Sequence, residues 1–319
     1  MKAAVLSRLG SEPEFKDFTD PVPQNDQQIV MRVKAAALKN LDKLKTYKDY
    51  YAPYQTLPVV VGTDGVGVLD NGQMVYAHGI TGTMAQKALV SADRYTVLPD
   101  NIDPAVAAAL PNAVLGSSVP LKVRANMKPG QVVVINGATG ITGKVAVQIA
   151  KHYGASRIIG IGRNENVLES LKSLGADDCI SLNQSNEDFI NKLKKIDKES
   201  PIDIVIDYLW GNPADMIINA FKNRVGGNVT FVNVGDMASS SINLTSGSLR
   251  STDITLIGSG FGSLNQEVLK RLTTEFLPEM FSLAAQGKLI INTENRRLED
   301  ISLAWNSASS GKRIVIEVD

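Results

Sequence analysis

The sequence predicts an α/β protein built around a doubly wound parallel sheet, with a second domain rich in strands. Between residues 119 and 261, continuous apolar runs alternate with amphipathic segments, which is typical of parallel strands joined by helices. Residues 1–118 instead contain short strand-like runs separated by Gly, Asp and Pro. A chain of 319 residues is also too long for one ordinary core, so we expect two domains.

The central region divides into strands and helices by its apolar spacing. In one predicted helix, Val167, Leu171 and Leu174 recur at four- and three-residue intervals and so share one buried face. Strands are predicted at 131–136, 157–162, 202–207, 228–234 and 254–258. Helices are predicted at 141–153, 164–174, 186–196 and 213–223.

The two ends of the chain are expected to form the second domain together. Towards the amino terminus, the pattern predicts strands at 29–33, 59–61 and 95–98, a hairpin turn at 70–72 and a helix over 103–110. Towards the carboxyl terminus, it predicts a long helix over 266–286 and strands at 288–291 and 313–318. These late strands have no helices of their own, so we expect them to complete the first domain.

Three glycines, Gly137, Gly140 and Gly143, follow the predicted strand at 131–136 and precede a helix. Glycines at this spacing permit a tight turn and let the backbone approach a pyrophosphate, whose charge free N–H groups at the helix start then stabilise. The position between strand and helix favours a dinucleotide-binding loop over a plain strand–helix turn. The residues expected to contact the pyrophosphate are Thr139, Gly140, Ile141, Thr142 and Gly143.

The end of the next predicted strand indicates which dinucleotide is bound. NAD-dependent proteins usually carry Asp or Glu there to bind the ribose 2′-OH, but this chain has Gly162, Arg163 and Asn164. A guanidinium can bind a 2′-phosphate through charge-assisted hydrogen bonds, so the sequence predicts NADPH, and Gly162→Asp is expected to favour NADH. The alternative is that Arg163 is a solvated charge at the start of a surface helix.

Two further segments are expected to approach the nicotinamide, because ligands bind at the carboxyl ends of parallel strands. Val234 and Gly235 end one predicted strand, and Ser259 and Phe261 follow the last strand of the central region. These four residues complete the predicted cofactor site.

The composition argues against several classes of function. Lys and Arg together number 33, as do Asp and Glu, so no net charge attracts the chain to nucleic acid or an acidic membrane. The single cysteine, Cys179, excludes an intrachain disulfide and a multi-cysteine zinc site. The amino-terminal apolar run is too short for a signal peptide, and we expect no stretch that approaches the roughly 18 apolar residues of a membrane span. These observations predict a cytoplasmic protein.

Short motifs recur along the whole chain in a characteristic order. Besides the glycine loop they are Met1-Lys2-Ala3, the segments 62–67, 98–100, 127–134 and 174–177, and Ser310-Gly311-Lys312. In this order and spacing the chain resembles the medium-chain dehydrogenase/reductase superfamily, and in particular its zinc-free quinone oxidoreductase branch.

The resemblance implies a barrel related to the small chaperonin GroES, formed by residues 1–118 and 262–319, and a Rossmann NADPH-binding domain over residues 119–261. It also implies an active-site cleft between the two domains. Finally, it implies a homodimer in which the apolar edge strand 254–257 pairs with the same strand of a second copy of the chain.

The zinc-dependent relatives carry a catalytic Cys where this chain has Lys39, and a His-Glu pair where it has Thr63 and Asp64. None of these residues supplies the sulfur and imidazole ligands that catalytic zinc prefers, so we predict no metal site. A short-chain reductase is also disfavoured, because none of the eight tyrosines is followed four residues later by the lysine which that family needs.

The resemblance implies substrate contacts at Lys39, Asn40 and Tyr50. Related quinone reductases carry Asn at the place of Lys39, so Lys39 is a departure that could hold the carbonyl oxygen or donate a proton, while Asn40 could take the amide's role. A solvated surface lysine is the other interpretation. Tyr47, Tyr51 and Tyr54 could join Tyr50 in lining a cleft for a flat substrate, or could pack at a domain edge.

Quinones and α,β-unsaturated carbonyl compounds (enones) are electron-poor and depend little on a metal to polarise them. We therefore expect an oxidoreductase that transfers hydride directly from NADPH to a quinone or enone, with the protein supplying orientation, exclusion of water and hydrogen bonds to the developing oxyanion. Two alternatives stay open. One is an enoyl-thioester reductase, and the other is a non-turnover NADPH-binding sensor or nucleic-acid-binding protein.

Overall fold

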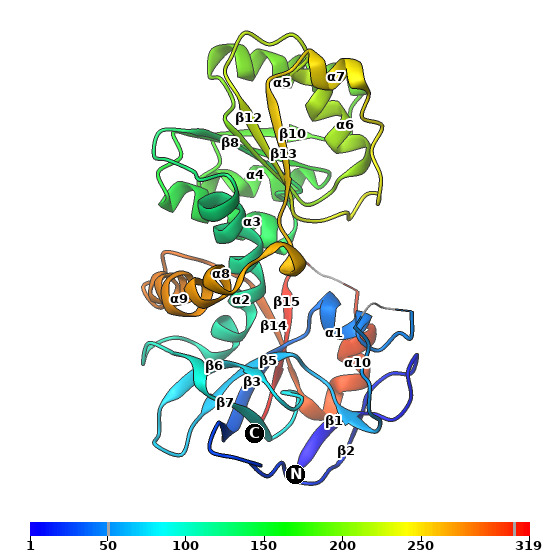
Figure 1. Ribbon diagram of the computed structural model, residues 1–319, viewed down its shortest axis with the longest axis vertical. Helices are drawn as coiled ribbons and strands as arrows, with labels where there is room; N and C mark the ends of the chain where they lie inside the picture. Colours follow the sequence, from blue (N-terminus) through cyan, green and yellow to red (C-terminus); the bar gives the residue numbers. More distant parts are fainter. Residues whose placement is uncertain (50–51, 309–310) are drawn as a thin grey trace. The chain divides into compact units, whose positions relative to one another are not determined.

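The computed structural model describes residues 1–49, 52–308 and 311–319 and divides into two compact units (Figure 1). One unit comprises Met1–Pro111 with Thr273–Asp319, and the other comprises Asn112–Leu272. Both divisions fall within helical segments, whereas the boundaries expected from the sequence lie at residues 118/119 and 261/262. We call the first the barrel unit and the second the nucleotide unit.

The nucleotide unit contains a fully parallel sheet with strand order β10-β9-β8-β11-β12-β13. Its strands are β8 (Val132–Asn136), β9 (Arg157–Gly162), β10 (Asp178–Ser181), β11 (Ile204–Asp207), β12 (Val229–Asn233) and β13 (Ile254–Gly258). The strand order reverses between β8 and β11, which is the switch point where doubly wound sheets bind ligands. The predicted fold class is therefore confirmed.

Helices pack on this sheet in pairs, α3 beside α4 and α5 beside α6 (Figure 1). Their bounds, with that of the short α7, are α3 (Ile141–His152), α4 (Glu165–Leu174), α5 (Asn186–Glu199), α6 (Gly211–Ala220) and α7 (Ser246–Arg250). Buried strand residues such as Val134 and Phe231 share one core with Phe189 and Leu193 of α5. The predicted helices and strands of this region are confirmed, but β10 had been missed.

The barrel unit is formed mainly by antiparallel pairs. One sheet has the order β14-β15-β3-β5-β6-β7, and an additional pairing of β3 with β7 closes four of these strands into a barrel. A smaller sheet has the order β2-β1-β4. The strands are β1 (Lys2–Leu6), β2 (Glu14–Asp17), β3 (Gln28–Ala37), β4 (Val59–Val60), β5 (Asp64–Val68), β6 (Met74–Gly79), β7 (Lys87–Val97), β14 (Thr293–Arg297) and β15 (Arg313–Glu317).

The carboxyl-terminal segment joins this unit, as predicted, because β15 pairs with β3. The expected long helix is divided into α8 (Gln266–Arg271), a π-helical turn (Leu272–Phe276) and α9 (Leu277–Ala285). The strand predicted at 288–291 is wrong. Leu289 and Ile291 are buried there in irregular chain, so the apolar pattern reflected burial rather than strand structure.

The remaining elements are short. They are α1 (Asn40–Leu44), α10 (Ile301–Asn306) and the 3₁₀ turns Phe261–Ser263 and Leu298–Asp300. The turn predicted at residues 70–72 is confirmed, because it connects the antiparallel strands β5 and β6.

Helix α2 (Pro104–Val119) is longer than the predicted 103–110 and continues into a π-helical turn (Pro120–Arg124). Among the described residues, Pro104–Arg124 is long and apolar enough to cross a membrane, contrary to the expectation that no stretch comes close. The helix runs through Pro111, just beyond the predicted end at residue 110. Since 67% of the apolar window is buried inside the protein, this composition is that of a core helix.

Candidate functional site

The glycine loop between β8 and α3 is packed so closely that it needs glycine. A Cβ atom on Gly143 would lie 2.3 Å from the Gly137 carbonyl oxygen, and Gly137 itself has a positive φ of 91°. A side chain at Gly143 would therefore push the helix away from the strand end, and one at Gly137 would strain the backbone of the turn. A Cβ on Gly140 would meet only the Gly137 oxygen, at 3.4 Å, so the backbone there is open to approach by a ligand.

The first turn of α3 presents unpaired amides beside this loop. Within the described chain, the N–H groups of Ile141, Thr142 and Gly143 donate to no acceptor, while the next amide, that of Lys144, donates to the Gly140 oxygen at 2.9 Å. Free amides at the start of a helix of 12 residues favour an anion. The loop therefore fits a pyrophosphate, with Thr139 beside it.

Arg163 begins the segment after β9, and its side chain is exposed and has no ion-pair partner among the described residues. Asn183, just after β10, donates to the Arg163 carbonyl oxygen at 2.7 Å, so the missed strand helps to fix this turn. The Asn164 side chain accepts the Val167 N–H at 3.1 Å and caps α4. Thus Arg163 is free to meet a phosphate, while the side-chain oxygen of Asn164 is already used.

Gly162 is less replaceable than the sequence suggested. A Cβ at Gly162 would lie 2.4 Å from Thr139 Cγ2, so an Asp there would displace part of the glycine loop itself. Any change in cofactor preference in Gly162→Asp could then arise from the added charge or from distortion of the glycine loop. Arg163 is the cleaner position for testing the NADPH prediction.

A buried polar network at the switch point had been missed by the sequence reasoning. Asn136, Asp207 and Asn233 are the last residues of three neighbouring strands and lie side by side in register. Asp207 accepts from the Asn136 amide at 2.7 Å and the Asn233 amide at 3.3 Å. Burial raises the pKa of Asp207, although these amides and the backbone N–H groups of Leu209 and Trp210 oppose the shift.

This network positions the predicted nicotinamide segments. The Asp207 carbonyl oxygen accepts from the Val234 N–H at 2.7 Å and from the Gly235 N–H at 3.2 Å. The Asn233 carbonyl oxygen accepts from the Ser259 N–H at 2.8 Å. Phe261 lies just beyond and is 47% exposed. Val234, Gly235 and Ser259 are thus fixed at the carboxyl edge of the sheet, where the prediction needs them.

In the barrel unit, Lys39 lies at the end of a short link between β3 and α1. Its side chain is only 4% exposed, so the interpretation as a solvated surface lysine is wrong. Lys39 Nζ donates to Asp64 Oδ1 and lies 3.9 Å from Asp42 Oδ2. An ammonium has three N–H donors, and the described protein atoms use one of them, in the bond to Asp64.

Asp42 holds the backbone around this lysine. Its Oδ2 accepts from the Lys39 N–H at 2.9 Å, and its Oδ1 accepts from the Thr63 N–H at 2.9 Å and the Thr63 hydroxyl at 2.7 Å. The segment before α1 is therefore tied to the segment before β5. These are the places where the zinc-dependent relatives would carry metal ligands.

The charges of Lys39, Asp42 and Asp64, which we call the Lys39 cluster, stabilise one another. Burial alone would lower the pKa of Lys39, but Asp42 and Asp64 outweigh it and raise that pKa. Burial alone would raise the pKa of Asp64, but Lys39, His78 and Tyr76 lower it. Lys39 is therefore a cation and Asp64 an anion at neutral pH, although both are buried.

The other predicted substrate residues differ in their surroundings. The side chain of Asn40 is exposed and makes no hydrogen bond to the described residues. Tyr50 and Tyr51 lie outside the residues that the structure describes. Tyr47 is 56% exposed, whereas Tyr54 packs against the barrel core and its hydroxyl oxygen accepts the Gly62 N–H at 3.3 Å.

Comparisons with known proteins show that this chain is similar to oxidoreductases. The zinc-binding dehydrogenase family matches residues 142–277. The probable NADPH-dependent quinone reductase tdiC of Emericella nidulans is 25% identical over 361 aligned residues, covering 99% of each chain. The chloroplastic NADPH-dependent alkenal/one oxidoreductase of Arabidopsis thaliana is 34% identical over 216 residues, which are 60% of this chain and 55% of that one.

The fold is also that of the quinone oxidoreductase from Thermus thermophilus, with a TM-score of 0.81 and 23% identity over 99% of this chain and 100% of that one. Together these comparisons make the chain similar to the medium-chain dehydrogenase/reductase superfamily, in agreement with the resemblance of its motifs. Among these relatives it is similar to quinone oxidoreductases, which is the resemblance that its order of motifs predicted. Its barrel unit is accordingly the GroES-like barrel of that fold.

At the positions that match the metal ligands of the zinc-dependent dehydrogenases, this chain carries Lys39 and Thr63 and not cysteine and histidine. The Lys39 ammonium lies against Asp64 and near Asp42, so a positive charge already occupies the place that a cation would take. Among the described residues, no group of three or more His, Cys, Asp or Glu side chains is placed to hold a metal. The donor set therefore does not fit a zinc ion.

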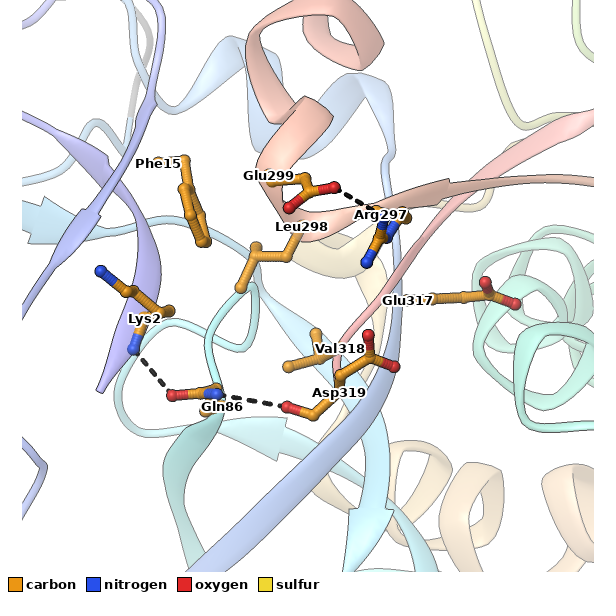
Figure 2. Close-up of a pocket in the computed structure, with 9 residues that line it drawn as sticks. All are labelled: Lys2, Phe15, Gln86, Arg297, Leu298, Glu299, Glu317, Val318 and Asp319. Carbon is orange, nitrogen blue, oxygen red and sulfur yellow. Dashed lines mark hydrogen bonds and ion pairs between the residues drawn. The ribbon is translucent and has the colours of Figure 1, made fainter.

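The barrel unit of this dehydrogenase/reductase also carries a shallow surface pocket, drawn in Figure 2. Its lining residues are Lys2, Phe15, Gln86, Arg297, Leu298, Glu299, Glu317, Val318 and Asp319. The charges are mixed, and Arg297 already pairs with Glu299 at 2.9 Å. None of the Lys39 cluster lines it, so we assign it no part in the reaction.

Proposed function

We propose that this oxidoreductase is a zinc-independent reductase of quinones or enones that uses NADPH. The observation that carries the proposal is Lys39, a buried cation with two N–H donors that no described residue accepts beside its bond to Asp64. The glycine loop, the free Arg163 and the names of the relatives in Emericella and Arabidopsis support NADPH.

The chemistry follows from where charge develops. When bound, NADPH supplies a hydride, which adds to the β-carbon of an enone or to a quinone and leaves negative charge on the carbonyl oxygen. Lys39 stabilises that oxygen with one of its spare N–H donors and then gives it a proton. Asp64 and Asp42 keep the lysine protonated and in place between turnovers. The exposed Asn40 amide is free to orient the substrate.

The proposal is tested by following NADPH absorbance with a small enone, a small quinone and an enoyl thioester, each repeated with NADH. We expect turnover of the enone or the quinone that depends strongly on NADPH. Turnover of the thioester alone would show that the substrate is an enoyl thioester and not an enone or a quinone. Tight NADPH binding with no turnover of any of the three would refute the proposal and favour a sensor.

A zinc requirement is tested in the same assay by dialysis against a chelator, with metal content measured before and after. Full activity of the metal-free protein is expected, because an ammonium occupies the cation position. Loss of activity that returns with added Zn²⁺ would contradict zinc independence.

A further inference from the structure

Lys39 is buried, so solvent has little direct access to an amine that has given up its proton. Only 4% of its side chain is exposed. Every turnover of the proposed reaction consumes one proton in addition to the hydride. The structure must therefore offer a route by which a proton reaches Lys39 from outside.

A continuous chain of polar groups leads from Lys39 to the surface. Lys39 Nζ donates to Asp64 Oδ1, and the Tyr76 hydroxyl donates to the other carboxylate oxygen, Asp64 Oδ2, at 3.1 Å. The Tyr76 hydroxyl oxygen lies 3.5 Å from His78 Nε2. Tyr76 is 2% exposed, whereas His78 is exposed. Each step is within hydrogen-bond reach of the next.

The strand pairing explains why these groups lie together. Asp64 on β5 is the direct cross-strand partner of His78 on β6. Tyr76 precedes His78 by two residues and so projects from the same face of β6. The Tyr76 and His78 rings meet edge to face with centroids 5.8 Å apart. Phe281 of α9 packs on the tyrosine ring, with centroids 5.9 Å apart.

Asp42 is a poorer intermediary than Asp64. Its oxygens already accept the N–H groups of Lys39 and Thr63 and the Thr63 hydroxyl. Its nearer oxygen to Lys39 Nζ is 3.9 Å away, beyond hydrogen-bond length. Asp64 instead bonds the ammonium with one oxygen and the Tyr76 hydroxyl with the other, so it connects Lys39 to Tyr76 directly.

We propose that Asp64, Tyr76 and His78 form a proton relay that returns a proton from solvent to Lys39 after each turnover. The inference rests on the proposed function, because it concerns the proton that the reduction consumes. The protonated His78 gives a proton to the Tyr76 oxygen as the Tyr76 hydroxyl proton passes to Asp64. The Asp64 carboxyl group then turns its protonated oxygen towards Lys39 and passes that proton to the neutral amine, and His78 takes a new proton from solvent. The net change is one proton moved from solvent to Lys39, with no change in oxidation state along the relay.

The relay predicts a specific kinetic signature, because Lys39 begins the first turnover already protonated. In His78→Gln and Tyr76→Phe, rapid mixing of the NADPH-loaded protein with an enone should give one fast turnover per site at the wild-type rate. Later turnovers should be slower by tenfold or more. His152→Gln, which removes the other histidine of the chain, is the matched control and should behave as wild type.

Added imidazole separates the relay from a structural role. It should restore steady turnover in His78→Gln, because the lost proton donor is at the surface, and should fail in Tyr76→Phe, because that break is buried. Unchanged steady rates in both variants, or an equal loss in the first turnover, would overturn the relay. If the wild type oxidises no NADPH with any substrate, the proposed function itself has failed, and that outcome is distinct.

Discussion

At the scale of single residues, Lys39 shows how one substitution changes the chemistry of a site. Where a zinc-dependent relative would carry a cysteine and a histidine for the metal, this chain holds an ammonium beside Asp64 and Asp42. An ammonium can stabilise an oxyanion and can also give a proton. This suits a substrate that is already electron-poor better than an alcohol or simple ketone, which needs stronger polarisation.

Lys39→Met should abolish that charge at nearly constant volume. We expect kcat with an enone to fall by about 10²–10³-fold, the usual cost of removing one oxyanion donor. The free energy of unfolding should fall by about 3–5 kcal/mol, because the buried Asp64 loses its ion-pair partner.

Two comparisons separate these effects. Lys34→Met, at an exposed lysine on the preceding strand β3, should change neither quantity. Adding Asp64→Asn to Lys39→Met should recover much of the lost stability in urea denaturation without recovering activity. If Lys39→Met alone keeps wild-type kcat, Lys39 is a structural ion pair and has no role in the chemistry.

At the scale of elements, the glycine loop and the strands were predictable because their signals are local. Glycine spacing, an apolar run and a following helix all lie within about twenty residues of sequence. Strand β10 was missed because Ile180 is the one fully buried residue among its four, so the run is not continuously apolar. The strand predicted at 288–291 is wrong for the opposite reason, because the apolar residues there are buried without pairing with another strand.

The segment directly after β9 leads to a prediction about cofactor preference. Arg163→Ala should raise the KM for NADPH by about 10- to 100-fold, because charge-assisted hydrogen bonds to a 2′-phosphate are lost. The KM for NADH should stay nearly constant, since NADH has no such phosphate. Arg250→Ala, at an exposed arginine of α7 in the same unit, is the control. Equal changes for both cofactors would show that Arg163 does not read the phosphate.

At the scale of the whole molecule, the missed parts of the site depend on contacts that the sequence does not display. The Asn136–Asp207 bond joins residues 71 positions apart, and its signal is three polar residues that each end a buried strand. The Asp64–Tyr76–His78 arrangement needs the antiparallel register of β5 and β6. Domain order and fold class were accessible from pattern and resemblance, whereas side-chain networks required the pairing of strands.

The sheet of the nucleotide unit also bears on assembly. In the described chain β13 pairs with β12 on one side only, and Ile254, Leu256 and Ile257 are half-buried. An apolar edge strand of this kind favours pairing with another strand, and a second copy of β13 across a twofold axis satisfies both edges at once. We therefore expect a homodimer of twice the 34.3 kDa chain mass in size-exclusion chromatography with light scattering.

Thr255→Lys tests this pairing, because Thr255 is exposed on β13 and a twofold interface would bring two like charges close together. The variant should elute at the mass of one chain. Ser241→Lys, which adds the same charge at an exposed position outside the sheet, should leave the dimer intact. A wild-type protein that has the single-chain mass at all concentrations would contradict the dimer, and the exposed edge of β13 would then need another partner.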